Sequence, residues 1–80
     1  MDLDQALQQV VDEHSFLAFV QALSADRRQA SDWQNDSIED FLDSAHAWAE
    51  ASAMGASQGL ADASPWKRFA VFLYCGKIYE

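Results

Sequence analysis

Apolar residues recur at helical spacing at the start of the chain. Leu3, Ala6, Leu7, Val10 and Val11 follow one another with Asp and Gln between them. This period predicts a short helix of about two turns. The pair Val10 and Val11 could instead form a short extended segment that leads into the next element.

A second apolar stripe predicts a longer helix. Asp12 can cap its free backbone N–H groups, and Glu13 favours the positive end of the helix dipole. We expect this helix to run to about Gln29. Its buried stripe comprises Phe16, Phe19, Val20 and Leu23.

A polar connection interrupted by Trp33 follows at residues 31–36. Its Ser, Asp and Asn residues are typical of turns and caps, and Asp36 with Glu39 has the spacing of a capping box. Two interpretations of Trp33 remain open. It can fold back on the first turn of the next helix as a hydrophobic staple, or it can stay exposed as an anchor for a partner.

The next helix has the clearest amphipathic pattern. At about 100° per residue, its core-facing residues share an arc of about 120°. They are Ile38, Phe41, Leu42, Ala45, Trp48, Ala49 and Ser52. A polar stripe of Glu39, Asp43, His46 and Glu50 runs beside them. The pattern predicts a helix with one buried face and one solvent-exposed face.

A glycine-containing loop at residues 54–63, with a weak turn expected at residues 58–60, precedes the last predicted helix. Ser64 is a favourable N-cap, and Pro65 suits a first helical position because its missing N–H costs nothing there. The run from 69 to 75 carries no strongly polar side chain. A helix that is apolar on nearly every side must be surrounded by the others.

The end of this helix is predicted from Gly76. A longer helix would place Lys77 on the same face as Trp66, Phe69 and Leu73, so we expect Gly76 to end or kink it, with the last residues as a tail. The alternative is that the apolar run is a buried strand, since Val, Phe and Tyr favour strands.

Short connections between these elements predict an all-α fold, a small bundle of about four helices with an apolar C-terminal helix at its centre. Residues 1–80 should form a single helical domain with one core. In that core, Phe69, Ala70 and Leu73 of the last helix should meet aromatic and aliphatic side chains from the second and third helices. Those side chains are Phe16, Phe19, Phe41, Leu42 and Trp48.

The charge of the chain narrows the function classes. A formal net charge of −8 on 80 residues argues against binding to nucleic acid or to anionic membranes, both of which need Lys and Arg. It favours attraction to a basic protein partner. A lone cysteine, an acidic start without a signal-peptide pattern and the lack of a run of about 20 apolar residues predict a soluble cytoplasmic protein.

Two stretches carry a family resemblance. Residues 33–42 read W-x-N-x-S-I-E-x-F-L, with Trp48 downstream, and residues 65–80 read P-W-x-x-F-A-x-x-L-x-x-G-K-x-Y-E. Together they resemble a family of short acidic bacterial proteins known only as a domain of unknown function, over most of the chain from about Val10 onward. The resemblance implies no catalytic residue. Such families are similar in size and charge to immunity proteins that neutralise basic nuclease toxins, and this analogy suggests an immunity- or antitoxin-like role.

Few residues are candidates for chemistry. Asp43 and His46 have the i, i+3 spacing of carboxylate metal sites in helical bundles, but such sites need further ligands from a second helix. Cys75 lies in the most apolar run, which favours a buried, inert thiol. Lys67 and Arg68 sit in a first helical turn, where the dipole disfavours cations, so we expect salt bridges to the acidic stripe; the alternative is that they bind a partner. We predict no catalytic residue and no cofactor.

The leading functional hypothesis is a non-enzymatic protein-interaction module with an acidic recognition face, because no Lys or Arg occurs between Arg28 and Lys67. The alternative is a small metal-binding protein or enzyme that uses His46 and neighbouring carboxylates. A third hypothesis is a homodimer through a flank of Phe72, Cys75 and Tyr79 that short neighbours would leave uncovered. The predicted partner-binding residues are Asp32, Trp33, Asp36, Glu39, Asp40, Asp43 and Glu50.

Overall fold

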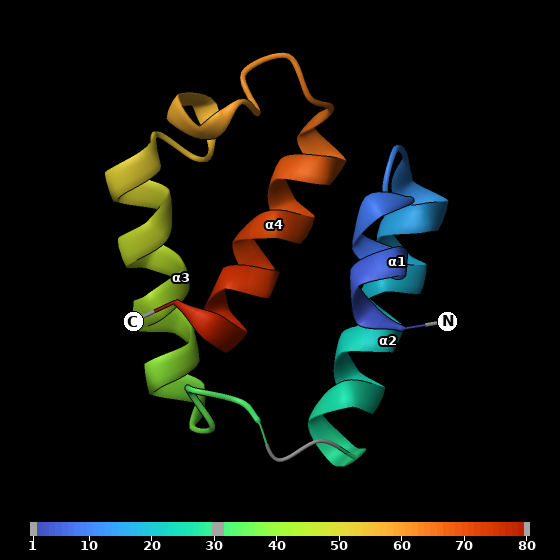
Figure 1. The fold of residues 1–80 in the computed structure, drawn as a ribbon, viewed down its shortest axis with the longest axis vertical. Helices are drawn as coiled ribbons and strands as arrows, with labels where there is room; N and C mark the ends of the chain where they lie inside the picture. Colours follow the sequence, from blue (N-terminus) through green and yellow to red (C-terminus); the bar gives the residue numbers. More distant parts are fainter. Residues whose placement is uncertain (1, 30–31, 80) are drawn as a thin grey trace.

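Four α-helices and one short 3-10 helix make up the part of the chain that the structure, a computed structural model, describes: residues 2–29 and 32–79. These residues contain no strand, so the all-α prediction is confirmed and the strand alternative for residues 69–75 is wrong. Figure 1 shows the last helix lying between the third on one side and the first two on the other. The elements are α1 (Leu3–Gln8), α2 (Glu13–Gln29), α3 (Ile38–Ser52), η1 (Ala56–Gln58) and α4 (Pro65–Ile78).

Side-chain caps fix where the first two helices begin. The Asp2 carboxylate accepts a bond of 2.8 Å from the backbone N–H of Gln5, and the Gln5 side chain accepts one from Asp2. Asp12 accepts from the backbone N–H of Ser15 at 2.9 Å, which confirms Asp12 as the cap of α2. The pair of valines lies in neither helix, and Val10 is buried in the core.

The start of α3 differs from the prediction. Ser37 is its N-cap and accepts from the backbone N–H of Asp40 at 3.1 Å, so the capping box expected between Asp36 and Glu39 is wrong. A Ser hydroxyl one residue later in the chain does the same work that was assigned to the Asp36 carboxylate. The 3-10 turn in the following loop likewise begins earlier than expected, at Ala56.

The helix α4 begins as predicted but ends later than predicted. Ser64 caps it and Pro65 occupies its first turn, as predicted. The prediction that Gly76 ends or kinks it is wrong, because the helix continues to Ile78 with Gly76 buried inside it. The reason for expecting a stop was Lys77, but that side chain is buried beside an acidic partner, Asp26. Of the predicted connection and tail, Ser31 and Glu80 lie outside the described residues.

The core forms where α4 meets its neighbours. Phe19 is fully buried and clusters with Leu23 and Ala70, while Trp48 of α3 is 3% exposed. The partly buried residues around this cluster include Phe16, Phe41 and Leu73, as predicted, together with Trp66, Tyr74 and apolar side chains of α1. No helix of the described part is long and apolar enough to cross a bilayer.

Three residues that were predicted to face the core lie at the surface. Ile38 is 75% exposed, Leu42 is 53% exposed and Phe69 is 46% exposed, so assigning them to the interior was wrong. Phe69 still contacts the core edge, where its ring centre lies 6.5 Å from that of Phe16 and 6.3 Å from that of Trp66. On each helix, the arc that contacts neighbouring helices is narrower than the arc of apolar residues. Apolar residues at the margin of the apolar arc are therefore exposed to water.

Candidate protein-interaction face

The predicted acidic residues share one property in the structure, which is exposure to solvent. Their side chains are those of Asp32, Asp36, Glu39, Asp40, Asp43 and Glu50. On α3 the order around the helix is a buried face, then Ile38 and Leu42, then the stripe of Glu39 and Asp43. An exposed apolar margin therefore separates the core from the carboxylates, so this side of α3 offers both apolar and charged contacts.

The cations of α4 do not neutralise that stripe. The ammonium of Lys67 donates to the Leu7 carbonyl at 2.6 Å and so caps the C-terminal end of α1. The Arg68 guanidinium donates to the carbonyls of Met54 and Ala53 at 2.9 and 3.1 Å, just beyond α3. The predicted salt bridges from Lys67 and Arg68 to α3 are therefore wrong, because both cations donate to backbone carbonyls at or just beyond helix ends instead.

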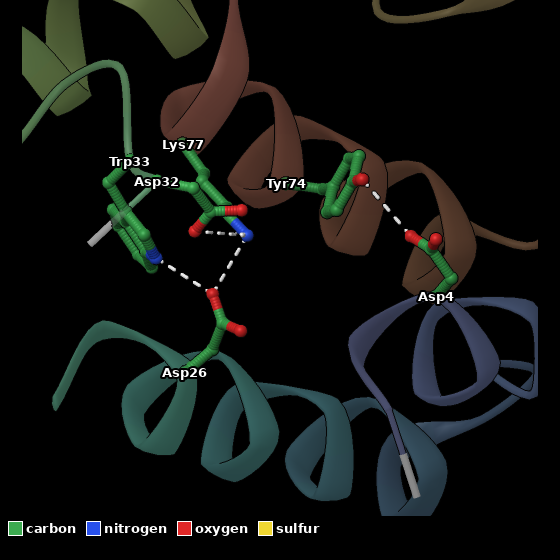
Figure 2. Close-up of polar contacts among 6 residues, drawn as sticks. All are labelled: Asp4, Asp26, Asp32, Trp33, Tyr74 and Lys77. Carbon is green, nitrogen blue, oxygen red and sulfur yellow. Dashed lines mark hydrogen bonds and ion pairs between the residues drawn. The ribbon is translucent and has the colours of Figure 1, made fainter. Parts of the chain in front are cut away.

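A buried ion pair ties α4 to α2. The Lys77 ammonium lies 2.8 Å from a carboxylate oxygen of Asp26, and the same oxygen accepts a bond of 2.7 Å from the indole N–H of Trp33 (Figure 2). Asp32 lies farther from the ammonium, at 3.7 Å. The Lys77 side chain is only 9% exposed, so Asp26 compensates a charge held away from water.

The pKa values of the pair follow from this contact. The hydrogen bond from Lys77 lowers the pKa of the Asp26 carboxyl, against the opposing effect of burial, and the indole of Trp33 lowers it further. Burial alone would lower the pKa of Lys77, but the hydrogen bond and charge of Asp26 raise it overall. Both shifts favour the charged forms, so the pair stays ionised at neutral pH.

Trp33 is held in place by four groups. Its ring stacks on Phe41 with centroids 5.9 Å apart, which is the fold-back onto the first turn of α3 that the staple interpretation predicted. The charged ends of Arg27 and Lys77 lie 5.7 and 5.8 Å from its ring centre. With its N–H bound to Asp26, Trp33 organises the fold, and its partly exposed ring lines the surface between α2 and α3.

The residues after Trp33 close the C-terminal end of α4. The backbone N–H of Gln34 donates to the Lys77 carbonyl at 3.1 Å, and the Asn35 amide donates to the carbonyls of Gly76 and Tyr79. These bonds satisfy carbonyls that a helix end leaves free. The sequence analysis missed Asn35 and the Lys77–Asp26 pair. A lysine on an apolar helix face was the available signal, because it needs an acidic partner.

The candidate chemical groups lie apart from one another. Cys75 is buried, and burial raises the pKa of its thiol to about 11, which suppresses the reactive thiolate. His46 is exposed on α3 beside Asp43. Among residues 2–29 and 32–79, no three His, Cys, Asp or Glu side chains are placed to hold a metal ion together.

The flank proposed for a homodimer is largely covered. Cys75 is buried, while Phe72 and Tyr79 are partly buried. Nearby, the Tyr74 hydroxyl donates to Asp4 at 3.0 Å and ties α1 to α4 (Figure 2); burial first and then this bond raise the pKa of Tyr74. The exposed apolar side chains that line a hollow are instead those of Ile38 and Leu42 on α3.

A family model covers most of the chain. The model of a family of unknown function (DUF7660) matches residues 12–80. The chain belongs to this family. The match begins at the cap of α2 and includes α3 and α4, whereas α1 lies outside the matched region. No curated protein and no solved structure matches the chain.

Proposed function

We propose that this member of the family is a non-enzymatic protein-interaction module whose acidic face on α3 recognises a basic protein partner. The observation that carries the proposal is the placement of the α4 cations. Lys67 and Arg68 bind carbonyls and Lys77 binds Asp26, so the ion pairs formed by the described residues leave the α3 carboxylates exposed and uncompensated.

The position of these carboxylates within α3 supports the same proposal. Glu39 and Asp40 stand in the first turn, where the helix dipole favours acids, so their presence has a structural reason. Glu50 stands in the last turn, where the dipole disfavours an anion, and the last turn carries no basic residue. The helix dipole therefore supplies no structural reason for an acid at Glu50.

Such a face would act mainly on the rate and selectivity of association. Exposed like charges steer an oppositely charged partner and repel acidic competitors, and the effect weakens as salt rises. Ile38 and Leu42 would supply the apolar contacts beside the charged rim that protein interfaces usually combine. An immunity- or antitoxin-like role against a basic toxin is one form that this function can take.

The test is affinity capture from the native host at low and high salt. Asp40→Lys/Asp43→Lys should lose the captured partner, whereas the matched double reversal Glu13→Lys/Asp62→Lys, which changes exposed residues outside α3, should retain it. The captured protein should be basic, and its recovery from wild type should fall with salt. Equal recovery by both double variants would refute the acidic face as the binding surface.

A further inference from the structure

A continuous apolar groove runs between α2 and α3. Two hollows form it, and Arg27, Trp33 and Phe41 line both. One hollow extends toward Ile38 and Leu42 of α3. The other extends along α2 and has Leu73 of α4 in its lining. The groove therefore has apolar walls from two helices, with α4 contributing to its floor.

The apolar residues on the α3 wall are unusually open to solvent. Ile38 is 75% exposed and Leu42 is 53% exposed. Both line the same hollow as the stacked rings of Trp33 and Phe41. Large apolar side chains that adjoin one another at a hollow mark a contact surface more often than single exposed ones do.

The two walls carry opposite charge. On the α2 side the groove is lined by Arg27 and Arg28. On the α3 side the residues next to the apolar margin, just outside the lining of the two hollows, are Glu39 and Asp43, both exposed. A groove with a basic wall and an acidic wall is complementary to a surface with the same two charges in reversed order.

The chain itself carries such a surface. Figure 1 shows that α2 ends and α3 begins at the same end of the molecule, and Arg28 is the last residue but one of α2 while Glu39 is the second residue of α3. A two-fold axis that runs parallel to the groove places the α2 wall of one copy against the α3 wall of the other, without a shift along the groove. It would set Arg28 of each copy against Glu39 of the other, with the apolar strips between them.

We propose that the occupant of the groove is a second copy of this chain, in a symmetric dimer about that axis. The same patch then serves on both subunits, as a two-fold interface requires. A two-fold axis across the groove would instead stack α3 on α3 and bring acidic stripes together. Since each chain carries a formal charge of −8, only the arrangement that pairs Arg28 with Glu39 offsets the repulsion between copies at the contact.

The dimer and the proposed basic partner would both use Ile38, Leu42 and Glu39, so each would exclude the other from that part of α3. Asp40 lies about 160° around α3 from Leu42, so it faces away from the groove and stays exposed in the dimer. The dimer also uses a different surface from the flank of Phe72, Cys75 and Tyr79, of which Cys75 is buried.

Sedimentation equilibrium of the full chain, from about 10 µM to about 1 mM, tests the proposal. We expect reversible dimers for wild type. Arg28→Glu alone and Glu39→Lys alone should each weaken self-association at least about tenfold, because each creates two like-charge contacts. An equimolar mixture of these two variants should dimerise again, since the mixed dimer has one native pair and one reversed pair. Asp62→Lys, a reversal outside the groove, should behave as wild type.

Circular dichroism melting shows that each variant is folded before its mass is compared. A monomer at every concentration would overturn the proposal and leave the groove for a helix of another protein. A dimer that Arg28→Glu and Glu39→Lys do not weaken would also overturn it, because the contact would then lie elsewhere. Failure of the mixture to recover dimers would show that the two residues do not face each other.

Discussion

The ring of Phe41 packs against the backbone of Gly76. A Cβ at position 76 would lie 2.8 Å from two atoms of that ring, closer than real Cβ contacts come. The ring is also stacked on Trp33, which limits how far it can move away. Gly76 therefore stands inside a helix because α3 and α4 approach each other closely there, and its role is to make room for Phe41.

This close approach predicts that Gly76→Ala destabilises the protein. Alanine favours a helix over glycine by about 1 kcal/mol, but overpacking against the ring costs about 1–3 kcal/mol. We expect a net loss of about 1 kcal/mol in the free energy of unfolding, measured by urea denaturation. In a Phe41→Leu background, which opens the space, the same change should stabilise. Equal effects of Gly76→Ala in both backgrounds would contradict the contact.

The sequence predicted the helices well where one strong local signal was present. Ser64 with Pro65 marked the start of α4, and Asp12 marked the start of α2, because a cap acts on backbone groups only a few residues away. It failed at Gly76 and Lys77. Their role depends on Phe41 and Asp26, which are distant in sequence, and no local pattern reveals such a pairing.

The candidate site was likewise predicted only in part. Exposure of the acidic stripe follows from helical periodicity, so Glu39 and Asp43 were placed correctly from the sequence. The interactions of Lys67 and Arg68 were not, since a helix start suggests only that a cation needs compensation and not which group supplies it. The groove was missed as well, because it arises from the relative placement of α2 and α3.

The core should dominate stability over the charged face. Phe19→Ala removes a fully buried ring and should cost about 3–5 kcal/mol, while Leu73→Ala, at a partly buried site, should cost about 1–3 kcal/mol. Glu50→Lys changes an exposed side chain and puts a cation in the last turn of α3, so it should change the free energy of unfolding by under about 1 kcal/mol, toward greater stability. Thermal melts of the three variants give the order directly. A larger loss for Glu50→Lys than for Phe19→Ala would contradict this core.

Cys75 should resist alkylation in the native protein. It is the single cysteine of the chain, so any thiol signal reports on it alone. Burial blocks access and, by raising the pKa to about 11, keeps the thiolate scarce at neutral pH. We expect iodoacetamide to label it slowly in buffer and rapidly in denaturant, as followed by mass spectrometry. Equally fast labelling in both solutions would place the thiol at the surface.

Removing Asp26 and removing Lys77 should lower the free energy of unfolding by different amounts. Asp26→Ala leaves the Trp33 indole N–H without its acceptor and the Lys77 ammonium with only the more distant Asp32 carboxylate at 3.7 Å, and should cost about 2–4 kcal/mol. Lys77→Met keeps the bond from Trp33 to an Asp26 side chain that is 25% exposed and so still partly hydrated. It should cost less, under about 2 kcal/mol. Urea denaturation at neutral pH measures both, and a greater loss for Lys77→Met would contradict this account.

The same pair should make stability fall in acid. The folded-state pKa of Asp26 is lowered by its bond from Lys77, so its contribution is present above the unfolded value of about 3.9 and is lost as pH falls through the folded value. The pKa of Lys77 is raised, so its contribution is present below about 10.4 and is lost only in strong alkali. Urea midpoints of wild type should therefore drop below about pH 4. Lys77→Met removes the main cause of the lowered pKa of Asp26 and should make this acid limb shallower, leaving the part due to Asp12, whose pKa is lowered by bonds from Ser15, whereas Lys67→Met, which removes a cation bonded to a carbonyl, should leave the limb unchanged. An acid limb of the same depth in Lys77→Met and wild type would show that carboxyls other than Asp26 govern the acid sensitivity.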